Sequence, residues 1–121
     1  ENNLESLTRL VSEIENPRLI LLHAGTVQVL ELAERMRPYR EVLLDLSHTL
    51  CKYEGSSLDL DLRFLFRTFD QRICVGSDSP EFHLPALRSR YEFFAEGLSD
   101  EKRRNIAYKN LFRFMKLEAP V

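Results

Sequence analysis

Leu19-Ile20-Leu21-Leu22 is an unbroken apolar run that ends at His23. A strand without alternation between apolar and polar residues is typical of a parallel sheet that is covered on both faces. Gly25 and Thr26 come next, and we expect them to turn the chain and cap a helix. The inner face of that helix comprises Val29, Leu32, Ala33 and Met36.

The same pattern of strand, polar residue and helix occurs twice more. Val42-Leu43-Leu44-Asp45-Leu46 predicts a second strand, and Ile73-Cys74-Val75 predicts a third. Apolar stripes at helical spacing predict helices in residues 4–14, 58–69, 84–94 and 100–115. Core candidates on these helices include Phe64, Phe66, Phe69, Phe93 and Phe94. Helices that alternate with strands indicate an α/β fold with parallel strands.

The composition is that of one globular domain spanning residues 1–121, with 44% apolar and 30% charged residues. The formal net charge of −2 gives no general attraction to nucleic acid or to an anionic membrane. No apolar run approaches the roughly 20 residues that span a bilayer. Two cysteines, Cys51 and Cys74, are too few for a disulfide framework. We therefore expect a cytoplasmic protein without a nucleic-acid or membrane partner.

Each predicted strand ends in residues capable of chemistry: His23, then Ser47 and His48, then Asp78. In parallel α/β folds, ligands bind at the carboxyl ends of the strands. Each residue also has an ordinary interpretation. His23 could be a buried histidine bonded to a backbone carbonyl, Asp78 could cap the turn before Pro80, and His48 could be a loop residue.

The strand ends resemble those of the amidohydrolase superfamily, in particular its branch of aminocarboxymuconate-semialdehyde decarboxylases and related hydrolases. Residues 17–25, from Pro17 to Gly25, are similar to the family's sixth strand. Residues 42–47 resemble its seventh strand, and residues 69–80 resemble its eighth strand with the Gly-Ser-Asp-x-Pro signature. Asn110 stands where the family's closing helix carries an asparagine.

The resemblance implies roles for two residues. Asp78 would bind a divalent metal, usually zinc, and act as general base for the water that the metal activates. His23 would be the companion acid or base beside a small-molecule substrate. The implied reaction is hydrolysis of a C–N or C–O bond, or decarboxylation of a small acid. The chain departs from the family in having His-Ala-Gly where His-Gly-Gly is usual.

The resemblance further implies the C-terminal part of a (β/α)8 TIM barrel, namely its sixth to eighth βα units. The family's other metal ligands, a His-x-His pair and a further histidine, would precede Glu1. We therefore expect little activity from this chain alone, because a catalytic zinc usually has three protein ligands. Open sheet edges pair readily with other strands, so we expect the remainder of the barrel or a second copy to cover them.

Two other interpretations stay open. The chain could be a non-catalytic α/β interaction module, or a small complete flavodoxin-like domain that binds phosphate or a nucleotide. The second is disfavoured because no glycine-rich loop follows any strand. Residues 23–26 contain a single glycine, Gly25.

Overall fold

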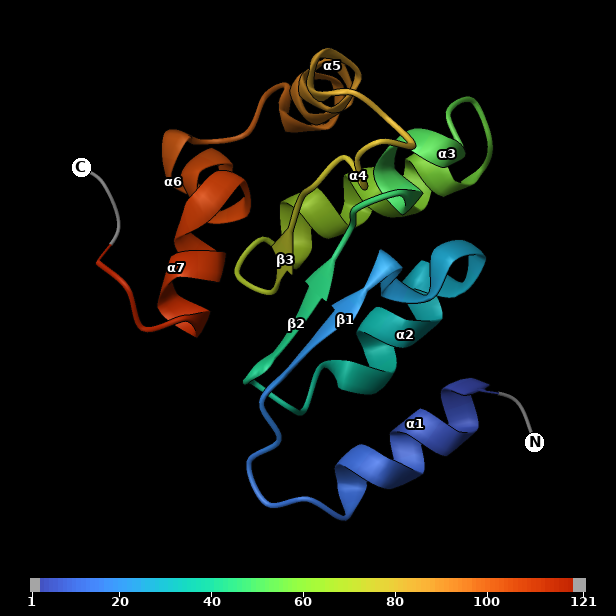
Figure 1. The fold of residues 1–121 in the computed structure, drawn as a ribbon, viewed down its shortest axis with the longest axis vertical. Coiled ribbons are helices and arrows are strands. Elements are labelled where there is room, and N and C mark those ends of the chain that lie inside the picture. Colours follow the sequence, from blue (N-terminus) through green and yellow to red (C-terminus); the bar gives the residue numbers. More distant parts are fainter. Residues whose placement is uncertain (1–2, 119–121) are drawn as a thin grey trace.

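The computed structural model describes residues 3–118 as helices arranged around a small sheet (Figure 1). The strands are β1 (Leu19–Leu22), β2 (Val42–Asp45) and β3 (Ile73–Cys74). The α-helices are α1 (Asn3–Ser12), α2 (Val29–Met36), α3 (Thr49–Lys52), α4 (Leu58–Thr68), α5 (Leu84–Ala95), α6 (Asp100–Arg104) and α7 (Asn110–Phe114). Two irregular helical turns complete the order, namely η1 (His23–Gln28) and η2 (Asn105–Lys109).

The three strands are parallel and lie in the order β1-β2-β3. Leu22 pairs with Asp45, and Asp45 pairs with Cys74. Helices connect successive strands, as the alternating pattern predicts. The fold is therefore α/β, with an open three-stranded parallel sheet. In Figure 1 the strands run between α2 on one side and α7 on the other.

The main core lies on one face of the sheet. Val42, Leu44 and Ile73 point to this face and are at most 1% exposed. They pack in one cluster with residues of α2 and α4. The apolar stripes predicted for these two helices are buried as expected: Val29, Leu32, Ala33, Met36, Leu58, Leu62, Leu65, Phe66 and Phe69. The spacing of apolar residues in the sequence thus correctly predicted which side of each helix faces the core.

The opposite face carries Ile20, Leu22, Leu43, Asp45 and Cys74, since side chains alternate along a strand and paired residues share a face. Leu43 and Cys74 are buried there, whereas Leu22 is 68% exposed. Within the part of the chain that the structure describes, β1 is therefore covered on one face only, and not on both as its unbroken apolar run predicts. β1 is an edge strand within residues 3–118, and nothing in that range covers Leu22.

Other differences concern local structure. Thr26 does not cap a helix: residues 24–26 have positive φ, and α2 begins only at Val29. The short helix α3 was not predicted, because four residues are too few to show a period. Phe64 and Phe93 are 39% and 44% exposed and are not core residues. Phe93 instead packs edge-on against Phe94 and has the guanidinium of Arg63 over its ring.

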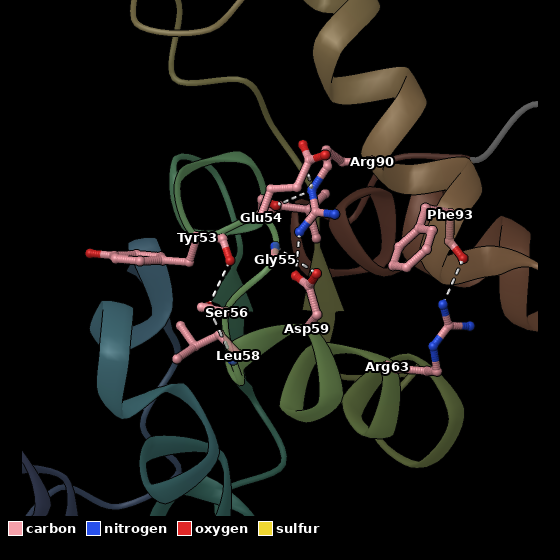
Figure 2. Close-up of polar contacts among 10 residues, drawn as sticks. Tyr53, Glu54, Gly55, Ser56, Leu58, Asp59, Arg63, Arg90 and Phe93 are labelled. Carbon is pink, nitrogen blue, oxygen red and sulfur yellow. Dashed lines mark hydrogen bonds and ion pairs between the residues drawn. The ribbon is translucent and has the colours of Figure 1, made fainter.

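A buried ion pair fastens α5 to α4 (Figure 2). The guanidinium of Arg90 lies 2.5 Å from the carboxylate of Asp59 and donates to the carbonyl of Leu50 at 2.9 Å. Their side chains are 8% and 20% exposed. Arg63 of α4 also donates to the carbonyl of Phe93 at 3.4 Å. These contacts position α5 and so anchor the far end of the loop that carries Asp78.

Asn110 anchors the end of the chain. It is 1% exposed, and its amide donates to the carbonyls of Asp70 and Ile73 at 2.5 and 2.8 Å. The closing helical segment is thereby held against β3. Within residues 3–118, no helix combines the length and apolar character needed to cross a membrane.

Candidate functional site at the carboxyl edge of the sheet

Three residues with unusual backbone angles follow the three strands. His23 comes directly after β1, His48 follows β2, and Asp78 follows β3. Their φ angles are +63°, +67° and +61°. Positive φ is uncommon in residues other than glycine. Such conformations cost on the order of 1–3 kcal/mol each and cluster at ligand and active sites. The coincidence of three at one sheet edge marks this edge as the candidate site.

His48 is the central residue of a γ-turn. Its angles are φ 67° and ψ −58°, and the N–H of Thr49 donates to the carbonyl of Ser47 at 2.7 Å. This turn is rare and strained. It reverses the chain directly after β2 and begins α3 one residue later. The turn thereby brings the imidazole of His48 close to His23 and Asp78.

The ring of His23 is held in one tautomer. Its Nδ1 lies 2.9 Å from the carbonyl oxygen of Ser47. A carbonyl oxygen can only accept, so Nδ1 carries the hydrogen and Nε2 of the neutral ring keeps its lone pair. His23 is thus bonded to a backbone carbonyl, as its ordinary interpretation expected, although it is partly rather than fully buried. This bond also leaves a nitrogen suited to proton transfer.

Asp45 supports that arrangement from the end of β2. Its carboxylate accepts from the N–H of Ser47 at 3.2 Å and from the Ser47 hydroxyl at 2.5 Å. Two bonds to one residue fix the orientation of Ser47, and with it the carbonyl that holds His23. The donors and acceptors are therefore fixed. The Ser47 hydroxyl donates to the Asp45 carboxylate, and Nδ1–H of His23 donates to the Ser47 carbonyl.

His48 lies next to both predicted site residues. Its ring centroid is 5.3 Å from that of His23. Its Nδ1 is 3.6 Å from a carboxylate oxygen of Asp78, too long for a hydrogen bond but close for an ion pair. The Asp78 side chain is 41% exposed. The turn after Asp78 is closed by its backbone carbonyl, which accepts from Glu81 at 2.9 Å.

Cys74 is buried beside Asp45. Its Sγ is 3.7 Å from the carboxylate, and burial together with that negative charge raises the pKa of the thiol to about 12. A protonated thiol is a poor nucleophile and metal ligand. Cys74 is therefore a structural residue at the base of the site.

Gly76 allows the end of β3 to approach β2 closely. A Cβ atom there would lie 3.2 Å from Cβ of Ser47. The glycine of the Gly-Ser-Asp signature is thus explained by packing between neighbouring strand ends, which brings Asp78 toward the His48 turn.

The sequence singled out His23 and Asp78, and the structure brings both to the same sheet edge. The sequence pattern assigned Asp45 no role and favoured a loop role for His48. Asp45 stands inside an apolar strand, and an acidic residue there was the available signal. The third histidine, His83, caps α5: its Nδ1 accepts from the N–H of Ala86 at 3.1 Å.

Metal-binding side chains are sparse at this edge. Among residues 3–118, no group of three or more histidine, cysteine, aspartate or glutamate side chains is placed to hold a metal ion. His48 and Asp78 form a pair of suitable donors, an imidazole and a carboxylate. Zinc accepts both kinds of donor, so this pair would meet two of the three protein ligands usual in a catalytic zinc site.

Comparison with known proteins adds no relative: no family model, curated protein or solved structure matches the chain. The amidohydrolase resemblance thus stays an interpretation of the residues at the strand ends.

Proposed function

We propose that this chain forms one side of the active site of a metal-dependent hydrolase of the amidohydrolase type. The reaction would be hydrolysis of a C–N or C–O bond, or decarboxylation, in a small molecule such as an amide, a lactone or a carboxylic acid. The observation that carries the proposal is the orientation of His23, whose Nδ1–H is bound by Ser47. Its Nε2 is left available at the edge that also carries Asp78.

His23 acts as the acid or base in this proposal. A histidine whose tautomer is set by a second group can accept a proton at one nitrogen and later return it. Asp45 and Ser47 act as positioning residues, since they hold the carbonyl that selects the tautomer. Protonation at Nε2 leaves the Nδ1 hydrogen bond intact, so the ring need not rotate during the proton transfer.

Asp78 would hold the metal, which we propose to be zinc, and His48 is the nearest further donor. When bound, a divalent ion there would polarise the scissile bond and lower the pKa of water toward 7. The remaining carboxylate oxygen of Asp78 can accept a proton from the attacking water. At 41% exposure, the Asp78 side chain is accessible to both water and substrate.

The fold fits the last three βα units of a (β/α)8 barrel. All three strands are parallel and in sequential order, and every candidate residue lies at their carboxyl edge. The partly uncovered face with Ile20 and Leu22 would line the barrel interior. The rest of the barrel, or a second copy, would supply the missing ligands and pair with the edge of β1. Both thiols are free, which suits the cytoplasm.

The deciding experiment is metal analysis and activity measurement on the full-length protein with two substitutions. Asp78→Ala should lose metal and activity together. His23→Gln should keep the metal and lose activity by about 10²–10⁴-fold, because only proton transfer is removed. Metal is measured by elemental mass spectrometry, and hydrolysis and CO₂ release are followed on a panel of small amides, lactones and acids.

Glu81→Gln is the matched control, since Glu81 is exposed, three residues away, and outside the site. It should retain both metal and activity. If wild type and Asp78→Ala have equal metal content and equal activity, Asp78 has no such role. A full-length protein without metal or activity would instead favour the non-catalytic interaction module.

A further inference from the structure

A polar cavity of about 740 Å³ lies at the opposite edge of the sheet, where β2 and β3 begin. Four arginines line it: Arg37 and Arg40 after α2, Arg72 before β3, and Arg113 on α7. Its volume is within the range of small-molecule sites. It is separated from the candidate active site by the length of the strands, on the order of 13 Å for four residues.

The two carboxylates that line this cavity, those of Glu41 and Asp70, lie near cations that do not line it. Glu41 lies 3.7 Å from Arg18, and Asp70 lies 3.8 Å from Lys102. Asp70 also accepts from Asn105 at 3.0 Å. The two acidic residues of the cavity wall therefore leave much of its positive charge uncompensated.

Among the four arginines, only Arg37 has a close carboxylate, Glu34 at 2.7 Å. Arg72 donates only to backbone carbonyls, those of Met36, Arg37, Tyr39 and Val42. Arg113 donates to the carbonyl of Gln71 and the side-chain oxygen of Asn110. Arg40 is exposed and makes no hydrogen bond or ion pair with residues 3–118.

Arg72 experiences the resulting repulsion. Burial and the charges of Arg37 and Arg40 lower the pKa of its guanidinium, and Glu41 offsets this only in part. Arg37 and Arg72 both stack on the ring of Phe69, at 5.0 and 4.9 Å from its centroid. An anion bound in the cavity would offset the repulsion between these like charges.

From this cavity we infer a binding site for a phosphate dianion, as free phosphate or a phosphate monoester, with Arg40 and Arg113 as its principal ligands. All N–H groups of the Arg40 guanidinium are available to a ligand. Arg113 uses one nitrogen, Nη2, to bind Gln71 and Asn110, so its other N–H groups are also available. Guanidinium groups bind phosphate oxygens through paired hydrogen bonds. Arg72 has its donors occupied and contributes charge rather than contacts.

The test titrates the full-length protein with inorganic phosphate by calorimetry, at constant ionic strength and low chloride because salt screens the interaction. Phosphate should bind and raise the Tm, whereas chloride should not. Arg40→Gln should weaken phosphate binding by about tenfold, or 1.4 kcal/mol. Glu34→Gln should tighten it, since it releases Arg37 from its carboxylate. Phosphoserine is the monoester probe: tighter binding than phosphate identifies an ester as the ligand, and weaker binding identifies free phosphate.

Two matched controls remove the same charges elsewhere. Arg88→Gln replaces another exposed arginine, on α5, and Glu31→Gln removes an exposed helical carboxylate outside the cavity. Both should leave the affinity within twofold of wild type. The inference would be overturned if phosphate released no more heat than chloride on titration into the protein. It would also be overturned if Arg40→Gln and Arg88→Gln bound phosphate with equal affinity. Asp78→Ala should bind phosphate normally, which separates this test from the proposed hydrolase.

Discussion

At the level of single residues, the site depends on strained backbone angles, which cannot be inferred from the type of side chain at each position. His23, His48 and Asp78 all adopt positive φ, and none is glycine. A sequence pattern reports polarity and spacing, so it identified strand ends but not the γ-turn at His48. That turn follows from tertiary packing, because Ser47 is held at once by Asp45 and His23.

Replacing His48 by glycine or by alanine separates strain from side-chain function. Both changes remove the imidazole near Asp78, but only glycine adopts φ 67° and ψ −58° without a Cβ clash. We expect His48→Gly to be more stable than His48→Ala by about 1–2 kcal/mol. Urea denaturation of both variants measures the difference. Equal stabilities would show that the turn is not strained.

The Cys74 thiol predicts a pH dependence of stability. In the unfolded chain it titrates near 8.5, and in the fold its pKa is about 12. Between these values the unfolded state loses a proton that the folded state keeps. The contribution of Cys74 is therefore fully present below about pH 8.5 and is lost as the pH rises toward 12.

Cys74→Ser tests this contribution, because serine does not titrate in that range. Compared with the variant, wild type should lose up to about 1.4 kcal/mol more stability per pH unit between roughly pH 9 and 12. Chemical denaturation at a series of pH values gives both slopes. Parallel curves for the two proteins would contradict a strongly raised thiol pKa.

At the level of elements, the helices follow the apolar period of the sequence, and their docking depends on polar contacts between distant residues. Arg90 and Asp59 are 31 residues apart and meet only because α5 folds back on α4. The N-cap of α6 was predictable: the Ser99 hydroxyl accepts from the N–H of Lys102 at 3.2 Å, three residues along. Local contacts could thus be predicted, whereas contacts between helices could not.

Arg90→Ala should destabilise the fold by about 3–5 kcal/mol, because it leaves the partly buried Asp59 carboxylate without its cation. Arg88→Ala, an exposed position two residues earlier, should change the stability by less than about 0.5 kcal/mol. Urea denaturation of both variants checks the contrast. A similarly small effect at both positions would mean that the pair does not hold α5 in place.

At the level of the whole molecule, the described sheet has two edges and one incompletely covered face. Leu22 is 68% exposed at the end of edge strand β1. Exposed apolar edge strands template pairing with other chains. The isolated chain should therefore self-associate, and sedimentation velocity over a range of concentrations would detect this.

Leu22→Lys should reduce that self-association, since a charge on an edge strand opposes pairing. Leu60→Lys is the matched control: Leu60 is 74% exposed but lies on α4, away from the sheet edge. It should leave association unchanged. A wild-type chain that stays monomeric at all concentrations would refute the idea that this edge requires a partner.

The sequence alone determined the α/β class, the three strands, most helices and the sheet edge at which the polar residues gather. These features depend on the period of apolar residues and on the alternation of strands and helices, which are local. The tertiary structure alone decided the His23 tautomer, the part played by Asp45 and the nearness of His48 to Asp78. These depend on neighbouring strand ends meeting across the register of a parallel sheet, where residues 24 to 30 positions apart come into contact, as from His23 to Ser47. Such contacts leave no periodic trace in the chain.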